Sequence, residues 1–129
     1  MNYLTFKNLD VKKFIQEHGR SPIIAVDFDG TCFITKFPEP GGIPRLEVIE
    51  TLRQKQKDGA YLILWTCRCG VYLQEAIELT KQHSVEFEKY NEPSDYELAN
   101  FDEHSSKIFA DIYLDDLCVN VNSEFLRRM

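Results

Sequence analysis

Unbroken apolar runs alternate along this chain with segments in which apolar positions recur at helical spacing. Two of the runs, Ile23–Val26 and Tyr61–Trp65, are typical of strands buried on both faces of a sheet. Shorter apolar segments predict a third strand at 85–87 and a fourth within 108–114. The pattern therefore predicts four short strands.

Three predicted helices separate or precede these strands. The first covers residues 10–18 and is followed by Gly19, a common stop signal. The second starts at Pro44 and ends before Gly59, and the third covers about 71–83. Strands that alternate with helices predict parallel βαβ units. We therefore expect an α/β fold, a three-layer sandwich around a mainly parallel, Rossmann-like sheet.

Two longer segments carry neither pattern and are expected to be loops. Residues 30–43 are rich in proline and glycine, and residues 90–106 are polar and irregular. The chain has 129 residues and shows no internal repeat or linker, so residues 1–129 are expected to form a single domain.

Composition narrows the class of protein. Hydrophobic residues make up 43% of the chain and charged residues 28%, as in ordinary globular proteins. The net charge is -6 without a lysine or arginine stripe, which argues against strong binding to a nucleic-acid backbone. No apolar run approaches the roughly 18 residues that cross a membrane, and the N-terminus lacks a signal-peptide pattern. We expect a cytoplasmic protein.

The four cysteines fit that compartment as free thiols. Cys67 and Cys69 lie close together, but a single residue separates them where zinc knuckles use roughly two to four. Reduced thiols that are structural or adjacent to the active site are the favoured interpretation over a zinc centre.

Chemically active side chains follow the predicted strands at the end where parallel sheets bind ligands. These strand-end groups are Asp27, Asp29, Gly30 and Thr31, then Thr66 and Arg68, then Lys107 with the pair Asp115 and Asp116. Any one aspartate here is more commonly a turn former or a helix cap than a catalyst. Four carboxylates in one place repel one another, however, and persist with a compensating cation. Hard oxygen ligands favour Mg²⁺ as that cation.

The order of these groups resembles the motifs of the haloacid dehalogenase (HAD) superfamily. The resemblance spans residues 23–118 and is most specific in the Asp-Phe-Asp-Gly-Thr segment that follows the first strand. It implies a small, capless, phosphatase-type member. The intervals that carry a cap domain in many relatives, between Asp29 and Thr66 and between Thr66 and Lys107, are too short here to hold one.

The resemblance also implies a role for each catalytic residue. Asp27 is the expected nucleophile, which becomes a phosphoaspartate. Asp29 is the expected general acid that protonates the leaving oxygen, and then the base that activates water. Thr66 is expected to hydrogen-bond the transferring phosphoryl group, and Lys107 to balance charge beside Asp27.

Magnesium and substrate contacts are implied in the same way. Asp115 is the expected Mg²⁺ ligand, together with the Asp27 carboxylate and the Asp29 backbone carbonyl, and Asp116 binds or positions the metal directly or through water. Gly30, Thr31 and Arg68 are expected to contact the substrate. A surface ion pair is an equally weighted interpretation of Arg68.

The resemblance leaves the substrate open. Asp29 favours phosphoryl transfer over dehalogenation, because the dehalogenases of the superfamily lack this second aspartate. The alternative is a catalytically silent binding module of the same fold. An open site suits a macromolecular phosphate, whereas a site closed by a partner subunit, in a homo-oligomer, suits a small phosphorylated metabolite.

Overall fold

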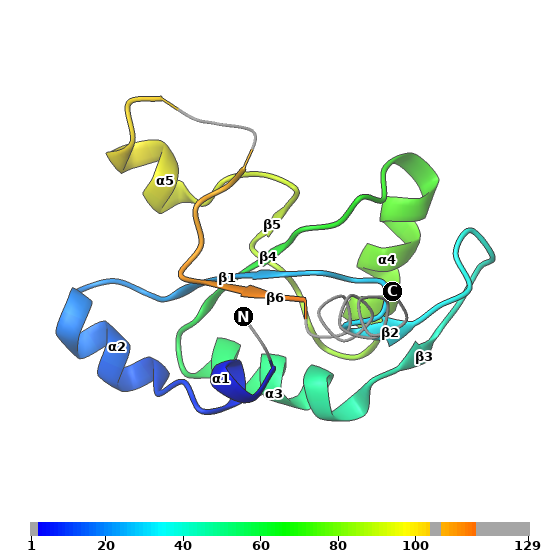
Figure 1. Ribbon diagram of the computed structural model, residues 1–129, viewed down its shortest axis with the longest axis horizontal. Helices are drawn as coiled ribbons and strands as arrows, with labels where there is room; N and C mark the ends of the chain where they lie inside the picture. The colour runs from blue at the N-terminus through cyan, green and yellow to red at the C-terminus, as the bar shows by residue number, and fades with distance from the viewer. Residues whose placement is uncertain (1–2, 104–106, 116–129) are drawn as a thin grey trace, which may run out of the picture.

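The computed structural model describes residues 3–103 and 107–115 of the chain. Its centre is a four-stranded sheet in the order β5-β4-β1-β6, in which every pair of neighbours is parallel (Figure 1). The strands are β1 (Ile23–Val26), β4 (Tyr61–Leu64), β5 (Lys89–Tyr90) and β6 (Ile112–Leu114). The predicted α/β fold class with a parallel sheet is therefore confirmed.

Helices flank this sheet. They are α1 (Tyr3–Lys7), α2 (Val11–His18), α3 (Leu46–Lys57), α4 (Gly70–Gln82) and α5 (Asp95–Asn100). In Figure 1, α1, α2 and α3 lie on one side of the sheet and α5 lies on the other. No helix in the part of the chain that the structure describes is long and apolar enough to cross a bilayer.

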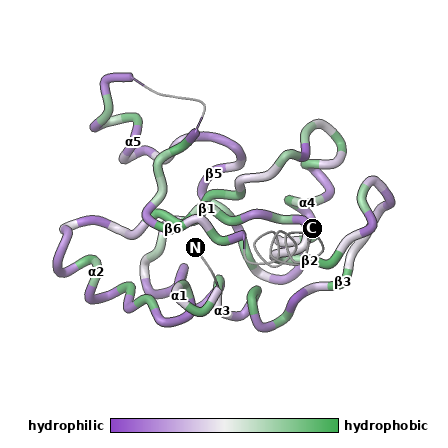
Figure 2. The backbone as a smooth tube through the Cα atoms, in the orientation of Figure 1, coloured by the Kyte–Doolittle hydropathy of each residue, from purple (hydrophilic) through white to green (hydrophobic). Residues whose placement is uncertain are grey.

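The two faces of the sheet build two apolar clusters, which explains the unbroken apolar runs in the sequence. Ile24, Val26 and Leu64 belong to the larger cluster, together with helix residues such as Leu52 and Ala76. The smaller cluster lies on the opposite face and consists of Ile23, Ala25, Ile63 and Ile108. The helices that cover the larger cluster show alternating polar and apolar bands in Figure 2, as amphipathic helices do.

Helix α2 follows its sequence signals closely. The Asp10 side chain accepts a hydrogen bond from the Lys13 amide at 3.1 Å, so it caps the first turn. Gly19 ends the helix in the left-handed conformation at φ 69°, which a glycine adopts without steric cost. The prediction of a helix at 10–18 is confirmed.

The third strand lies elsewhere than expected. Val85 and Phe87 are buried, but the residues that pair with β4 are Lys89 and Tyr90. The apolar alternation at 85–87 therefore arises because a connecting segment is buried. The hydrogen bonds to β4 begin only at the Glu88 amide, which donates to the Leu62 carbonyl at 2.9 Å.

Two segments expected to be loops contain regular structure. Residues 30–43 include β2 (Phe33–Ile34), which pairs in antiparallel fashion with β3 (Ile43–Pro44). Because Pro44 belongs to this hairpin, helix α3 begins at Leu46 rather than at the proline. Within 90–106, Ser94 caps α5 by accepting a hydrogen bond from the Glu97 amide at 3.1 Å. A serine followed three residues later by glutamate is a known helix-start signal.

An ion pair fixes the edge of the sheet where the parallel strands begin. Arg20 donates from both terminal nitrogens to Asp111, each at 2.8 Å, and the Ile23 amide donates to the same carboxylate at 2.8 Å. The guanidinium carbon also lies 4.5 Å from the ring centroid of Tyr96. This cluster ties the segment before β1 to the segment before β6, at the edge opposite the candidate site.

Candidate functional site

Asp27, Trp65 and Asp115 come directly after three neighbouring strands and form one row. The Trp65 amide donates to the Val26 carbonyl at 2.9 Å, and the Asp27 amide donates to the Leu114 carbonyl at 3.0 Å. These bonds continue the parallel ladder by one residue, so Asp27 lies opposite both Trp65 and Asp115. Adjacent strands are about 4.8 Å apart, which places Asp27 in the middle of the row, with an indole on one side and a carboxylate on the other.

This row opens into a pocket of about 370 Å³. The residues that line the pocket are Ala25, Asp27, Trp65, Lys107, Tyr113, Leu114 and Asp115. Three of the residues expected in the site, Asp27, Lys107 and Asp115, are thus brought together around one space. Trp65 and Tyr113 line the same space and were missed as site residues, although each lies next to or near a strand end that carried a candidate.

Asp115 carries an oxygen that fits a metal ion. Its Oδ1 is buried and has no hydrogen-bond partner among the described residues. A buried carboxylate oxygen is costly unless a hydrogen bond or a cation satisfies it, and here a second carboxylate, Asp27, lies opposite. Two hard oxygen donors at adjacent strand ends are what Mg²⁺ takes from proteins, with water completing its shell.

The expected set of metal ligands is only partly described. Within residues 3–103 and 107–115, no three histidine, cysteine, aspartate or glutamate side chains gather into a metal site. Asp27 and Asp115 supply two carboxylates, and the expected contribution of Asp29 is a backbone carbonyl. Asp116 lies outside the described residues. The donors present therefore fit Mg²⁺ as a partial oxygen set.

Lys107 lies on the pocket wall at the segment that leads into β6. Its Nζ is 4.9 Å from the ring centroid of Tyr113, and the Tyr113 hydroxyl hydrogen-bonds to the Ile108 carbonyl. A cation over an aromatic face is held by the negative charge of that face. Tyr113 thus keeps an ammonium group at the wall that Asp27 and Asp115 share.

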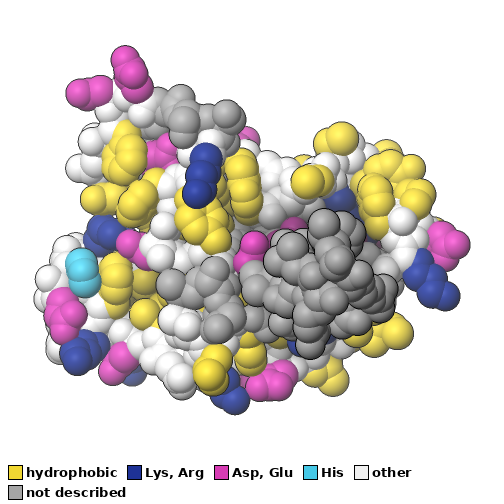
Figure 3. Space-filling view, viewed as in Figure 1, with side chains coloured by type: hydrophobic (Ala, Val, Ile, Leu, Met, Phe, Trp, Pro, Cys, Tyr) yellow, Lys and Arg dark blue, Asp and Glu magenta, His cyan; other side chains and the backbone are white. Residues whose placement is uncertain are grey.

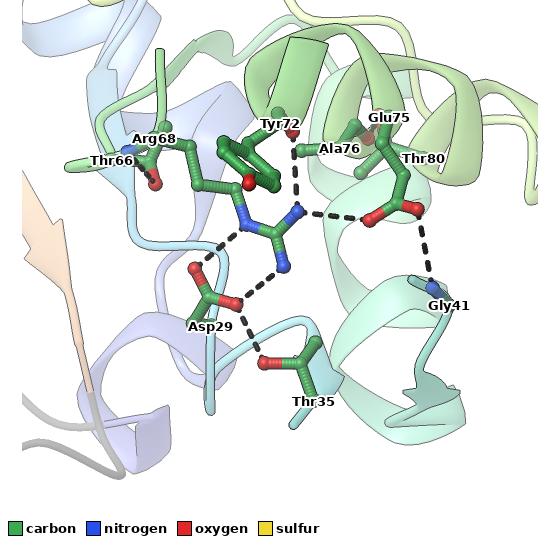
Figure 4. Close-up of polar contacts among 9 residues, drawn as sticks. All are labelled: Asp29, Thr35, Gly41, Thr66, Arg68, Tyr72, Glu75, Ala76 and Thr80. Carbon is green, nitrogen blue, oxygen red and sulfur yellow. Dashed lines mark hydrogen bonds and ion pairs between the residues drawn. The ribbon is translucent and has the colours of Figure 1, made fainter. Parts of the chain in front are cut away.

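Asp29, two residues after Asp27, turns to a different neighbour. Arg68 donates from Nε to Oδ2 at 3.0 Å and from Nη2 to Oδ1 at 2.8 Å, and the Thr35 hydroxyl donates to Oδ1 at 2.6 Å (Figure 4). Partial burial alone would raise the pKa of the Asp29 carboxyl. The hydrogen bonds from Arg68 and Thr35 outweigh burial and lower that pKa below its ordinary value.

Arg68 is buried, and its guanidinium is held by groups of the protein itself. Nη1 donates to Glu75 Oε1 at 3.1 Å and to the Tyr72 carbonyl at 3.2 Å, in addition to the two bonds to Asp29. The guanidinium carbon lies 4.7 Å from the Phe28 ring centroid and 4.8 Å from that of Phe37. This arrangement differs from the expected substrate contact. It is the ion pair of the alternative interpretation, in the interior rather than at the surface.

Thr66 is not among the residues that line the pocket. Its Oγ1 accepts a hydrogen bond from the Arg68 amide at 3.2 Å, and its own amide donates to Asn91 Oδ1 at 2.8 Å. The Asn91 side chain also donates to the Arg68 carbonyl at 3.3 Å. Asn91 thereby clamps the turn from Thr66 to Arg68 onto the end of β5, and its left-handed backbone, φ 56°, is one that asparagine tolerates.

The comparison with solved structures gave one informative relative. A conserved protein coded by a locus of Bacteroides thetaiotaomicron is 34% identical to this chain and superposes with a TM-score of 0.64. The match covers 82% of this chain and 89% of the other. This chain belongs to the family of that conserved Bacteroides protein. A scan against protein-family models and a search of curated proteins each gave no match.

The turn after Asp29 is more enclosed than the sequence indicated. Gly30 has a φ of 83°, a conformation that suits glycine, and its amide donates to the Phe33 carbonyl at 2.7 Å. Thr31 is fully buried, and its Oγ1 has no hydrogen-bond partner among the described residues. Thr31 is not among the residues that line the pocket, and its expected contact with the substrate stays a prediction.

The rim beside the Asp29–Arg68 pair is apolar. Phe37 of the loop between β2 and β3 packs edge-on against Tyr72 of α4 at a centroid distance of 5.1 Å. Both rings are about half exposed, and Val71 beside them is 77% exposed. In Figure 3, hydrophobic side chains gather on the surface over this hairpin and the start of α4. Cys67 and Cys69, at the start of the same helix, are exposed free thiols.

Proposed function

We propose that this protein is a magnesium-dependent phosphoester hydrolase, a phosphatase that acts through a phosphoaspartate on Asp27. The observation that carries the proposal is the row in which Asp27 lies opposite Asp115 at adjacent strand ends, with Lys107 on the wall of the same pocket. The order of these groups along the chain resembles that of the HAD superfamily, which supports the same reaction.

The Asp27 and Asp115 carboxylates would hold the Mg²⁺ ion, together with the Asp29 backbone carbonyl. When bound, Mg²⁺ offsets the negative charge of the two carboxylates and of a phosphoester dianion. Asp115 Oδ1 has no hydrogen-bond partner among the described residues, which supports this assignment, because a buried carboxylate oxygen is costly unless a hydrogen bond or a cation satisfies it. Lys107 adds a second positive charge at the same wall.

In the proposed reaction, one carboxylate oxygen of Asp27 attacks phosphorus, and the ester bond between phosphorus and the leaving oxygen breaks. The leaving oxygen takes a proton from Asp29. In the second step, water gives a proton to Asp29 and attacks the same phosphorus, and the bond to Asp27 breaks. The products are an alcohol, inorganic phosphate and the restored Asp27 carboxylate.

The Asp29–Arg68 ion pair sets a condition on this cycle. All the charge-assisted bonds of the pair favour the ionised form of Asp29. Asp29 can therefore take up a proton from solvent, and then deliver it to the leaving oxygen, only after its carboxylate has left the guanidinium. The hairpin supplies Thr35 to the same carboxylate, so a shift of the hairpin upon substrate binding is a physical route to that release.

A second candidate function is binding without turnover. The observation in its favour is the same ion pair, because a carboxylate held by a buried arginine is poorly placed to act as a general acid. A silent module of this kind would still bind Mg²⁺ and a phosphorylated ligand at Asp27 and Asp115.

A panel of phosphomonoesters, assayed with Mg²⁺ and with a chelator in its place, separates the two functions. Phosphate release that needs Mg²⁺ and is lost in Asp115→Asn, prepared in the same way, supports the hydrolase. Binding of Mg²⁺ without release from any ester of the panel, a generic aryl phosphate included, contradicts it and favours the binding module.

A further inference from the structure

The row at the strand ends is chemically asymmetric. Asp115 on one side of Asp27 carries the charge that suits a metal ion, and Trp65 on the other side carries a large flat ring. Trp65 is only partly buried, and it packs against the small apolar cluster that includes Ala25 and Ile63. Its indole thus belongs both to the core and to the wall of the pocket.

The pocket combines charged groups, among them Asp27 and Asp115, with the aromatic ring of Trp65. Aromatic side chains in such a position commonly give a ligand a flat apolar surface, while a few charged groups fix its polar end. The pocket volume of about 370 Å³ lies in the range of small-molecule sites. Tyr113 is less suited to the same task, because Lys107 lies over its ring.

We propose that Trp65 recognises the leaving group, and that the substrate is a small phosphomonoester bearing a flat aromatic ring system, such as the base of a nucleoside monophosphate. This inference rests on the proposed hydrolase for the placement of the phosphate at Asp27. The ring of the ligand stacks on the indole one strand away. Stacking of this kind tolerates many ring systems, because every base offers a π face.

Trp65 itself reports the binding, because it is the single tryptophan of the chain. We would titrate Asp27→Asn, with Mg²⁺ present, with adenosine monophosphate, phenyl phosphate and ribose phosphate, and correct the fluorescence for ligand absorbance. The two aromatic ligands are expected to quench Trp65 and ribose phosphate is not.

Calorimetry on substituted proteins gives the second readout. Trp65→Leu in the same background is expected to lose about tenfold or more in affinity for adenosine monophosphate and to leave ribose phosphate binding unchanged. Trp65→Phe keeps a flat ring and should retain most of the preference. Tyr72→Leu removes an exposed aromatic ring that does not line the pocket, and it should change neither affinity.

The outcomes separate this inference from the hydrolase proposal. Equal affinity for adenosine monophosphate and ribose phosphate, or a preference that survives Trp65→Leu, overturns the aromatic subsite even if wild-type protein hydrolyses both. Preference for the aromatic ligands that depends on Trp65, without hydrolysis by wild-type protein, overturns the hydrolase and supports the subsite.

Discussion

Arg68 and Asp29 form a two-point ion pair across 39 residues of sequence, with Nε–Oδ2 at 3.0 Å and Nη2–Oδ1 at 2.8 Å. The pair joins the turn after β1 to the turn before α4 (Figure 4). It also directs the Asp29 carboxylate towards α4, whereas Asp27 faces the pocket that it shares with Asp115. Asp27 and Asp29, which are separated by a single residue in the sequence, therefore contact different neighbours.

Arg68→Gln is expected to destabilise the protein strongly. The guanidinium is almost completely buried, whereas the Asp29 and Glu75 carboxylates keep 34% and 28% of their side-chain surface exposed. Removal of one partner of a buried pair costs roughly 3–5 kcal/mol, and the remaining exposure of both carboxylates places this case at the low end. Urea unfolding measures the loss directly.

Arg53→Gln is the matched control. Arg53 pairs with Glu50 on the surface of α3, and both side chains are well exposed. Exposed pairs contribute about 0–1 kcal/mol, so this change should be small. Equal losses in the two variants would contradict the interior role of Arg68.

The strand ends could be predicted from the sequence because they depend on local patterns. The apolar runs before Asp27 and Trp65 indicate strands buried on both faces, and parallel strands bring their ends to one edge. The aspartates of the row follow from that rule alone.

The partners of Asp29 could not be predicted from the sequence, because they come close to it only when the chain has folded and no local pattern marks them. Thr35 reaches Asp29 because residues 30–43 fold into a hairpin, and Arg68 turns inward between the exposed Cys67 and Cys69. Burial of an arginine needs several acceptors at once, and their convergence appears only in the folded chain. The capping pair that starts α5, by contrast, could have been recognised in the sequence.

The protein is expected to lose stability in acid as the Asp111 carboxylate becomes protonated. Burial alone would raise the pKa of its carboxyl, but hydrogen bonds from Arg20 and the Ile23 amide lower it below the ordinary value of 3.8. A carboxyl whose pKa is lower in the folded state stabilises the protein above its unfolded-state pKa. That stabilisation is lost as the pH falls through the folded-state pKa.

The free energy of unfolding, measured across this acidic range for wild-type protein and Asp111→Asn, isolates the contribution. The difference between the two proteins should be constant above the ordinary carboxyl pKa and should shrink as the pH falls below it. A difference that does not change with pH would mean that the Arg20–Asp111 pair contributes through packing alone.

Magnesium should raise the thermal midpoint of unfolding, because a ligand that binds only the folded state stabilises it by mass action. Asp115→Asn is expected to remove most of this shift. The same variant should be at least as stable as wild-type protein without metal, since it removes the negative charge from one of two carboxylates at adjacent strand ends. Differential scanning calorimetry with and without Mg²⁺ measures both effects.

Asp10→Asn controls for the loss of one negative charge. Asp10 caps α2 on the surface, and asparagine caps helices about as well as aspartate. Mg²⁺ should therefore raise the thermal midpoint of Asp10→Asn by as much as that of wild-type protein. If Mg²⁺ still raises the thermal midpoint of Asp115→Asn as much as that of wild-type protein, the metal does not bind at Asp115.

We propose that Asp27 is the nucleophile, and the rate of magnesium-dependent phosphate release by Asp27→Asn tests this role most directly. Loss of a covalent nucleophile should lower kcat by at least about a thousandfold, with Asp10→Asn within about twofold of wild-type protein. Circular dichroism should show that both variants keep the wild-type fold. A folded Asp27→Asn protein that retains kcat within about tenfold of wild-type protein would contradict the mechanism.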